Sequence, residues 1–176
     1  MGHLQFILEM KKFGIIGYPL AQSASPAFFN AKFRAEGIDA EYIPFEIKSI
    51  DELPAVLEAH PELCGFNVTI PYKVEVMKYL DGISDEAKSI NAVNVVKVTR
   101  DKDGKSCLWG YNSDVIGFTR SIEPFVKEKH CKALVLGTGG ASKAIIHSLK
   151  QLGIEPQPVS RTASNTAIAY SDITAD

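Results

Sequence analysis

Short apolar runs alternate with amphipathic stretches along most of the chain, and this alternation predicts an α/β fold. Three apolar runs have the length of strands: residues 13–17 (FGIIG), 41–47 and 63–70 (LCGFNVTI). Between the first two, Ser25 and Pro26 are typical of a helix start with Ser25 as the cap, and Gly37 is placed to end that helix. Phe29 and Phe33 then share one face of this helix.

Caps and breaking residues continue the alternation after the third run. Pro71 ends the strand, and Asp103-Gly104 predicts a hairpin turn. Four more helices are expected: one that begins at Ser49, one over residues 72–80, a short one after Ser84 and one over residues 115–129. Two more strands are expected over residues 92–99 and 107–111.

The pattern changes at Lys132. The continuous apolar run 133–136 is typical of a parallel strand that is buried on both faces. A glycine-rich turn, a helix from Gly139 to about Gly153 and a strand over residues 157–160 follow, which predicts a βαβ unit. The sequence after Arg161 is too short to hold the further strands of a doubly wound sheet, so we expect this second domain to be incomplete at its C-terminal end.

Composition narrows the class of protein. With 176 residues, 45% hydrophobic and 23% charged, the chain has the composition of a globular protein. Its net charge of −2 does not indicate the excess of basic residues that nucleic-acid binding requires. No apolar run is long enough to span a membrane. Three widely spaced cysteines suggest neither disulfides nor zinc, and four scattered histidines lack a metal-binding pattern, so we expect no metal and a reducing, cytoplasmic location.

The glycine-rich turn is the strongest local motif. Gly137, Gly139, Gly140 and Ala141 follow a strand and open a helix, where small residues let a pyrophosphate approach backbone N–H groups. A tight turn that only packs the helix on the strand is the alternative. At the end of the next strand, the run Ser160-Arg161-Thr162 suits a 2′-phosphate better than a 2′-hydroxyl, which favours NADP over NAD, although a solvated loop arginine would look the same.

Polar side chains also gather at strand ends in the first part of the chain. Ser23 and Ser25 precede a helix and are placed to hold an anion, and the alternative is simple helix capping. Asn67 and Thr69 share a strand face and Lys73 is expected one turn into the next helix, where these three side chains would line a site. Amides and a carboxylate also stand beside apolar runs, at Asn91, Asn94, Asn112 and Asp114, where turn formation is the default explanation.

Together these motifs resemble those of the shikimate dehydrogenase family, from about Lys11 to the last residue. The resemblance implies that Ser23 and Ser25 bind the substrate carboxylate, that Asn67, Thr69 and Asn94 contact the substrate, and that Lys73 is the catalytic lysine with Asp114 as its partner. It also implies NADP binding by residues of the two later motifs, namely Gly137, Gly139, Gly140, Ala141, Ser160, Arg161 and Thr162. Val95, Ser160 and Asn165 depart from the family's usual residues.

The implied protein has an N-terminal substrate-binding α/β domain over residues 10–114 and an incomplete Rossmann-like NADP-binding domain over residues 115–176, with residues 1–9 as an extension or scar. The implied reaction is the NADP-dependent interconversion of shikimate and 3-dehydroshikimate, in chorismate and aromatic amino-acid biosynthesis, by a monomer or homodimer. A quinate/shikimate dehydrogenase of broader specificity, a non-catalytic shikimate-binding fragment and an unrelated dinucleotide-binding domain remain as alternatives.

Overall fold

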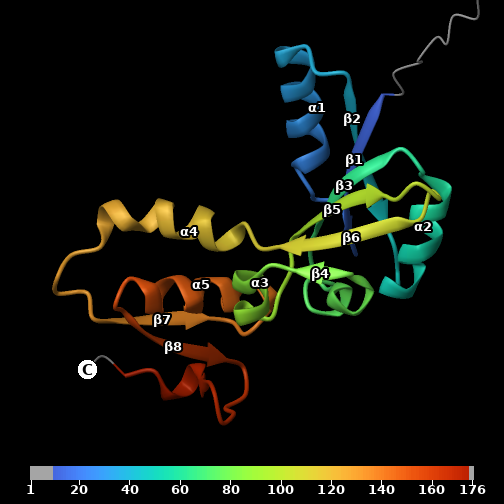
Figure 1. Cartoon of the computed structure of the whole chain (residues 1–176). Coiled ribbons are helices and arrows are strands. Elements are labelled where there is room, and N and C mark those ends of the chain that lie inside the picture. The colour runs from blue at the N-terminus through green and yellow to red at the C-terminus, as the bar shows by residue number, and fades with distance from the viewer. Residues whose placement is uncertain (1–9, 175–176) are drawn as a thin grey trace, which may run out of the picture.

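A mixed sheet of six strands in the order β2-β1-β3-β5-β6-β4 organises the first part of the chain, and a separate sheet in the order β7-β8-β9 organises the rest (Figure 1). The structure is a computed structural model that describes residues 10–174. The strands are β1 Lys11–Gly17, β2 Ala40–Glu46, β3 Leu63–Val68, β4 Gly82–Ile83, β5 Val95–Arg100, β6 Ser106–Tyr111, β7 Lys132–Leu136, β8 Glu155–Ser160 and β9 Ile168–Ala169. The α-helices are α1 Ser25–Glu36, α2 Leu53–Ala59, α3 Asp85–Ile90, α4 Asp114–Ile122 and α5 Gly140–Gln151.

Strand direction brings the candidate residues to one edge of the six-stranded sheet. Strands β1, β2 and β3 run parallel, so the loops that follow them leave the sheet at the same edge. Strand β5 is antiparallel to β3, and its first residue, Val95, pairs with both Asn67 and Tyr111. The start of β5 and the end of β6 therefore lie at the edge where β1 to β3 end.

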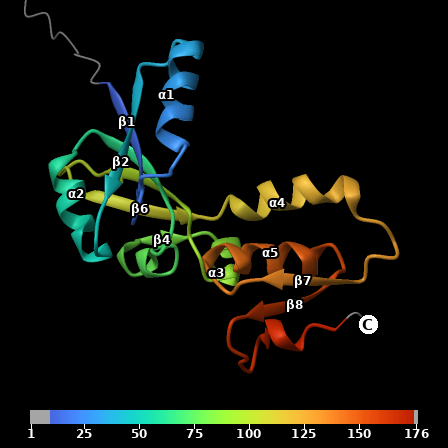
Figure 2. The same ribbon diagram turned by 180° about the vertical axis from the view of Figure 1, so that it is seen from behind.

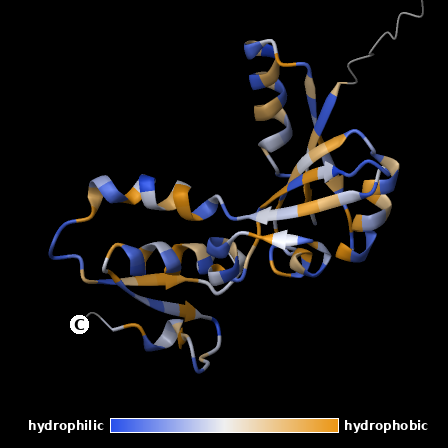
Figure 3. Ribbon diagram, viewed as in Figure 1, coloured by the Kyte–Doolittle hydropathy of each residue, from blue (hydrophilic) through white to orange (hydrophobic). Residues whose placement is uncertain are grey.

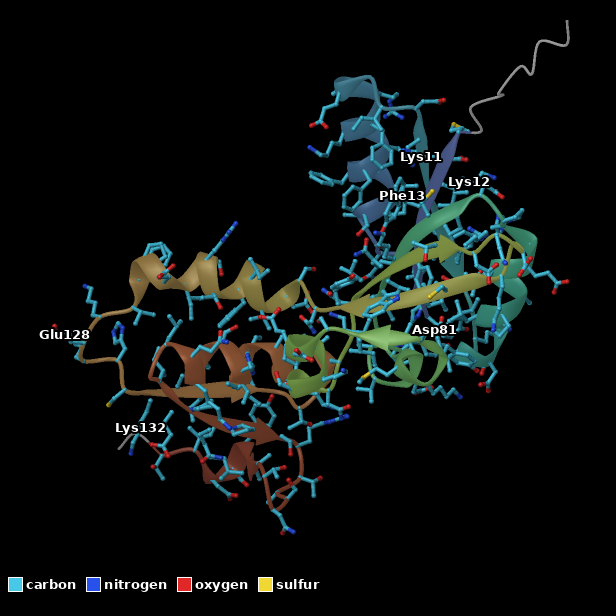
Figure 4. The ribbon with its side chains drawn as sticks, viewed as in Figure 1. Lys11, Lys12, Phe13, Asp81, Glu128 and Lys132 are labelled. Atoms are coloured by element: carbon cyan, nitrogen blue, oxygen red, sulfur yellow. The ribbon has the colours of Figure 1, made fainter. Side chains whose placement is uncertain are left out.

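The two faces of this sheet are covered differently. One face carries the main core, in which Ile16, Leu53, Leu63 and Val76 have no or almost no exposed surface. On the other face, α1 packs over β1 and β2 through a cluster of aromatic side chains that includes Phe29 and Phe33. Figure 4 labels Phe13 on β1 beside this helix.

Helices α4 and α5 lie side by side over the three-stranded sheet in both opposite views (Figures 1 and 2). A small buried cluster of Ile90, Ala92, Val115 and Ala144 joins them to the segment before β5. The Ser148 hydroxyl donates a hydrogen bond to the Val115 carbonyl across 3.3 Å. The predicted βαβ unit is confirmed, because β7 and β8 are parallel and α5 connects them. Glu128 and Lys132, labelled in Figure 4, lie at the end of this part that is remote from the six-stranded sheet.

Three helix predictions are wrong in detail. Ser25 is the first residue of α1 and not its cap, because the helix begins one residue earlier than the Ser-Pro pattern suggests and Ala24 takes the cap position. Residues 72–80 form turns and a 3-10 helix, Glu75–Tyr79, instead of an α-helix, so Lys73 stands in a turn. The predicted helix over residues 115–129 ends at Ile122, where a short 3-10 segment containing Pro124 replaces it.

Strand β7 is parallel as predicted, but it is not buried on both faces. Leu134 is 51% exposed and Leu136 is 65% exposed, while Val135 is buried. Figure 3 shows the hydrophobic stretch along β7. The reason is that β7 is an edge strand and that helices α4 and α5 cover only one face of its sheet. The expected extension over residues 1–9 lies outside the described residues, and the two predicted domain boundaries remain predictions.

An ion pair at the start of β1 and β3 gives a testable pH dependence. Lys12 Nζ lies 2.6 Å from Glu62 Oε1. The hydrogen bond from Lys12, and after it a backbone hydrogen bond, lowers the pKa of Glu62 from 4.5 to about 2. Because the folded-state pKa is the lower one, this stabilisation is complete above about pH 4.5 and is lost as the pH falls toward 2. We expect Glu62→Gln to reduce the dependence of thermal unfolding on pH in this window. The exposed Glu58→Gln variant is the control, and an unchanged pH dependence in Glu62→Gln would contradict the assignment.

Candidate active site

An ion pair between Lys73 and Asp114 forms the centre of the candidate site. Lys73 Nζ lies 2.6 Å from Asp114 Oδ2, and the two side chains are 14% and 33% exposed. Asp114 opens α4, so its carboxylate stands at the positive end of that helix. The turn that carries Lys73 is fixed by its carbonyl, which accepts a hydrogen bond of 2.7 Å from the Val93 amide. Residues 41 positions apart are thus paired at the end of the sheet.

Two buried amides hold Asp114 in place. Asn94 Nδ2 donates to Asp114 Oδ1 across 2.6 Å and to the Ser113 hydroxyl across 3.1 Å, and its Oδ1 accepts from the Ser113 amide at 2.8 Å. Asn112 accepts a hydrogen bond from the Asp114 amide through Oδ1 and donates to the Ala92 carbonyl through Nδ2. Buried polar groups of this kind are costly unless they are paired, so the network orients the carboxylate toward Lys73.

A hydrogen-bonded chain continues from this network to the start of α1. Asn67 Nδ2 donates to the Asn94 carbonyl across 3.3 Å, and the Tyr42 hydroxyl donates to Asn67 Oδ1 across 2.7 Å. Burial raises the pKa of Tyr42, and the nearby Ser25 side chain partly opposes this shift. Sequence reasoning missed Tyr42, whose only signal was a hydroxyl at a buried position of strand β2.

Ser23 and Thr69 lie at the same edge of the sheet. The loop that carries Ser23 is anchored by Glu46, which accepts a hydrogen bond of 2.6 Å from the Leu20 amide. The Thr69 amide donates to the Ile16 carbonyl across 2.9 Å. Thr69 Cγ2 packs directly on Gly17, where an added Cβ would meet it at 2.4 Å. Within residues 10–174, neither the Ser23 nor the Thr69 hydroxyl takes part in a hydrogen bond, so both can bind a ligand.

The glycine-rich turn lies against Lys73. A Cβ added at Gly140 would come within 3.1 Å of Lys73 Cβ, so the turn and the lysine side chain are in contact. Gly137 has φ +109°, which L side chains rarely adopt, and its amide donates to the Val159 carbonyl. A cleft of about 640 Å³ opens here, and its walls include Lys73, Gly137, Gly139, Gly140 and Ala141.

The residues of the turn fit the pyrophosphate of a dinucleotide. Gly139 caps α5 without a side chain, and a Cβ there would meet no atom within 4 Å, so the space in front of the helix is open. The first N–H groups of a helix have no partner within the helix and favour an anion. Among the described residues no group of histidine, cysteine and acidic side chains is arranged to hold a metal ion.

The three residues predicted to bind the 2′-phosphate, Ser160, Arg161 and Thr162, are not part of the cleft wall. The Ser160 hydroxyl donates to the Thr162 carbonyl, which closes a tight turn after β8. Arg161 and Thr162 are exposed beside it, and none of the three residues lines the cleft. The structure therefore brings the lysine, the carboxylate and the glycine turn together and leaves Arg161 at the surface near the end of β8.

Fold and site together define an α/β protein in which a mixed sheet is followed by a Rossmann-like βαβ unit. Residues 15–96 match the family described as shikimate dehydrogenase substrate binding domain. The NADP-dependent shikimate dehydrogenase of Aquifex aeolicus is 45% identical over 150 residues, which are 82% of this chain and 53% of the relative. Residues 15–96 thus match that domain family, and 82% of the chain is similar to a shikimate dehydrogenase, which confirms the predicted resemblance and fold class.

Solved structures agree with this relationship. The crystal structure of the Aquifex aeolicus shikimate dehydrogenase matches with a TM-score of 0.76 at 40% identity, over 88% of this chain and 57% of that one. The Thermus thermophilus enzyme, solved in complex with NADP(H) and shikimate, matches with a TM-score of 0.75 at 30% identity, over 91% of this chain and 62% of that one. The chain spans about half the length of the curated relatives it matches.

Proposed function

We propose that this chain supplies the substrate site and part of the cofactor site of an NADP-dependent shikimate dehydrogenase, which interconverts shikimate and 3-dehydroshikimate. The observation that carries the proposal is the Lys73–Asp114 pair, which lies in contact with the glycine turn through Gly140. A proton-transferring group and the place for a nicotinamide dinucleotide are thereby adjacent. The relatives' names and the complex with NADP(H) and shikimate support the same reaction.

The mechanism assigns the proton to Lys73. The residues Gly137, Gly139 and Gly140 would hold the cofactor, of which the oxidised form NADP+ would accept the hydride and the reduced form NADPH would supply it. In the oxidation of the alcohol, the neutral Lys73 amine accepts the hydroxyl proton as the carbonyl forms. In the reverse direction, the Lys73 ammonium donates that proton to the developing alkoxide. Asp114 holds Nζ at 2.6 Å and compensates its positive charge, while Asn94 keeps the carboxylate aligned.

The remaining candidates bind and orient the substrate in this proposal. Ser23 and Ser25 bind the carboxylate at the start of α1, and Asn67 and Thr69 bind the ring hydroxyls. Asn94, whose two side-chain N–H groups are taken by Asp114 and Ser113, acts on the substrate through Asp114. The support is their placement along one edge of the sheet, together with the unused hydroxyls of Ser23 and Thr69 among the described residues. The glycine turn binds the pyrophosphate of NADP in front of α5, and Ser160, Arg161 and Thr162 bind the 2′-phosphate.

Arg161 gives a sharp test of the cofactor preference. A guanidinium forms charge-assisted hydrogen bonds with a phosphate, so Arg161→Ala is expected to weaken NADP binding by about 10- to 100-fold. NAD lacks the 2′-phosphate, and its affinity should stay unchanged. Isothermal titration with both cofactors measures the two effects, with the exposed Arg120→Ala as a matched control. Equal losses for NADP and NAD would contradict a role in 2′-phosphate recognition.

The proposed reaction is tested by NADPH formation from shikimate, with quinate as the competing substrate. A large preference for shikimate in kcat/KM supports the proposal, whereas similar values indicate the broader quinate/shikimate specificity. Shikimate binding without NADPH formation, by this chain alone and by the chain joined to the C-terminal portion of a relative, would instead indicate a non-catalytic binding module.

The partners proposed for this chain are small molecules. No helix in the described part of the chain is long and apolar enough to cross a membrane. Cys64, Cys107 and Cys131 are all free thiols, which is compatible with the proposed reducing cytoplasm. A monomer or a homodimer remains the proposed assembly.

A further inference from the structure

Tyr42 is a buried residue beside the candidate site whose position is held from two sides. Its side chain is almost fully enclosed, at 4% exposed, and its ring stacks on Phe29 with the centroids 4.7 Å apart. The Asn30 carboxamide binds both backbone groups of Tyr42, accepting from its amide at 2.8 Å and donating to its carbonyl at 2.9 Å. These contacts fix the position of the Tyr42 ring and therefore the position of its hydroxyl oxygen. Burial raises the pKa of Tyr42, so this hydroxyl remains a proton donor at neutral pH.

The Tyr42 hydroxyl and the Asn94 carbonyl together fix the orientation of the Asn67 amide. The Asn94 carbonyl can only accept a hydrogen bond, so the group of Asn67 that faces it, at 3.3 Å, must be the NH2 group. Asn67 Oδ1 must then point to the Tyr42 hydroxyl, which donates to it across 2.7 Å. Rotation of the amide by 180° would place two acceptors against each other and cost a buried hydrogen bond.

One N–H group of the Asn67 side chain has no hydrogen-bond acceptor among the described residues. The NH2 group carries two hydrogens, and among the described residues only the Asn94 carbonyl accepts one of them. Both hydrogens of Asn94 Nδ2, by contrast, are taken by Asp114 and Ser113. The unused N–H of Asn67 belongs to the strand end where the Lys73–Asp114 pair and Thr69 also lie.

We propose that Tyr42 is a positioning residue for substrate recognition, whose hydroxyl holds Asn67 so that its free N–H is presented to a ring hydroxyl of the substrate. The inference rests on the proposed function and adds to it a residue that does not touch the substrate. A purely structural hydroxyl would satisfy a buried acceptor and stabilise the fold without affecting ligand affinity. The two roles therefore differ in whether the effect of Tyr42 passes through Asn67.

A double-mutant cycle separates these roles. Shikimate affinity is measured by isothermal titration for the wild-type chain, Tyr42→Phe, Asn67→Ala and the double variant. Tyr42→Phe keeps the ring stacked on Phe29 and is expected to weaken shikimate binding about tenfold, the effect of one hydrogen bond. In the Asn67→Ala background, the same substitution should have no further effect. NADP affinity should stay unchanged in Tyr42→Phe.

The control variant is Tyr79→Phe, which removes another phenol hydroxyl that is hydrogen-bonded to a side chain, here the exposed Asp51. Tyr79 packs against the main core and not against the aromatic cluster that contains Tyr42. The control variant should bind shikimate as the wild type does. An equal affinity in Tyr42→Phe, or a loss that persists in the Asn67→Ala background, would overturn the positioning role and leave the proposed function intact. No shikimate binding by the wild-type chain would overturn the proposed function and this inference together.

A measurement on the wild-type chain covers the case in which Tyr42→Phe fails to fold. The two side-chain amide protons of Asn67 have separate NMR resonances, and only one of them is without a protein acceptor. Titration with shikimate should shift that proton strongly and the proton on the Asn94 carbonyl weakly. Equal shifts of both protons, or no shift of either while shikimate binds, would overturn the inference.

Discussion

Lys73→Ala is expected to lower turnover of shikimate by about 10²–10⁴-fold, the range for the loss of a general acid–base group. The variant removes the amine that lies 2.6 Å from Asp114, and among the described residues no second lysine pairs with this carboxylate. Substrate affinity should fall much less than turnover, because the serine, threonine and asparagine candidates remain. Steady-state NADPH formation measures kcat and KM separately.

The matched control for this prediction is Lys78→Ala. Lys78 is also paired with an aspartate, Asp51, but its side chain is 57% exposed and it lies in the 3-10 helix away from the glycine turn. We expect the Lys78→Ala variant to turn over shikimate at the same rate as the wild type. Unchanged turnover in Lys73→Ala, with the control also active, would remove Lys73 from the mechanism.

Asp114→Asn is expected to be far more harmful than its similar shape suggests. The Asp114 carboxylate accepts on both oxygens, from Lys73 at Oδ2 and from Asn94 Nδ2 at Oδ1. An asparagine would present an NH2 group to one of these two donors in either orientation. We expect a loss of about 1–3 kcal/mol of stability from the unsatisfied donor and a fall of about 10²-fold or more in turnover.

Asp85→Asn provides the control for Asp114→Asn. Asp85 is likewise the first residue of a helix, α3. Its side chain is fully exposed, and its distance of 3.7 Å to Lys88 is longer than the 2.6 Å between Asp114 and Lys73. The helix-dipole contribution of an acidic first residue is therefore removed in both variants, while the donor clash arises only at Asp114. In Asp85→Asn, the midpoint of urea unfolding and the rate of NADPH formation should both equal those of the wild type. Equal behaviour of the two variants would show that Asp114 acts only as a helix-opening residue.

Local sequence patterns predicted the elements that depend on neighbouring residues. The cap at Ser49 is present, and the Ser49 amide donates a hydrogen bond of 2.9 Å to Glu52 Oε1. The hairpin at Asp103-Gly104 is also present, because Gly104 takes a left-handed conformation with φ +80°. The expected α-helix over residues 72–80 is absent because the Lys73 carbonyl accepts a hydrogen bond from the Val93 amide, and the Met77 amide bonds to the Val74 carbonyl instead of to Lys73.

The sequence by itself predicted the candidate site residues and the alternation that makes the fold α/β, since caps, turn glycines and apolar periodicity are local properties of the chain. Only the tertiary structure showed that Asn94 uses both amide hydrogens within the protein and that the Tyr42 hydroxyl donates to Asn67. These pairings join residues far apart in the chain through the register of β3, β5 and β6. Register follows from how the buried faces of the strands fit one another, which is a property of the packed sheet and not of any single segment.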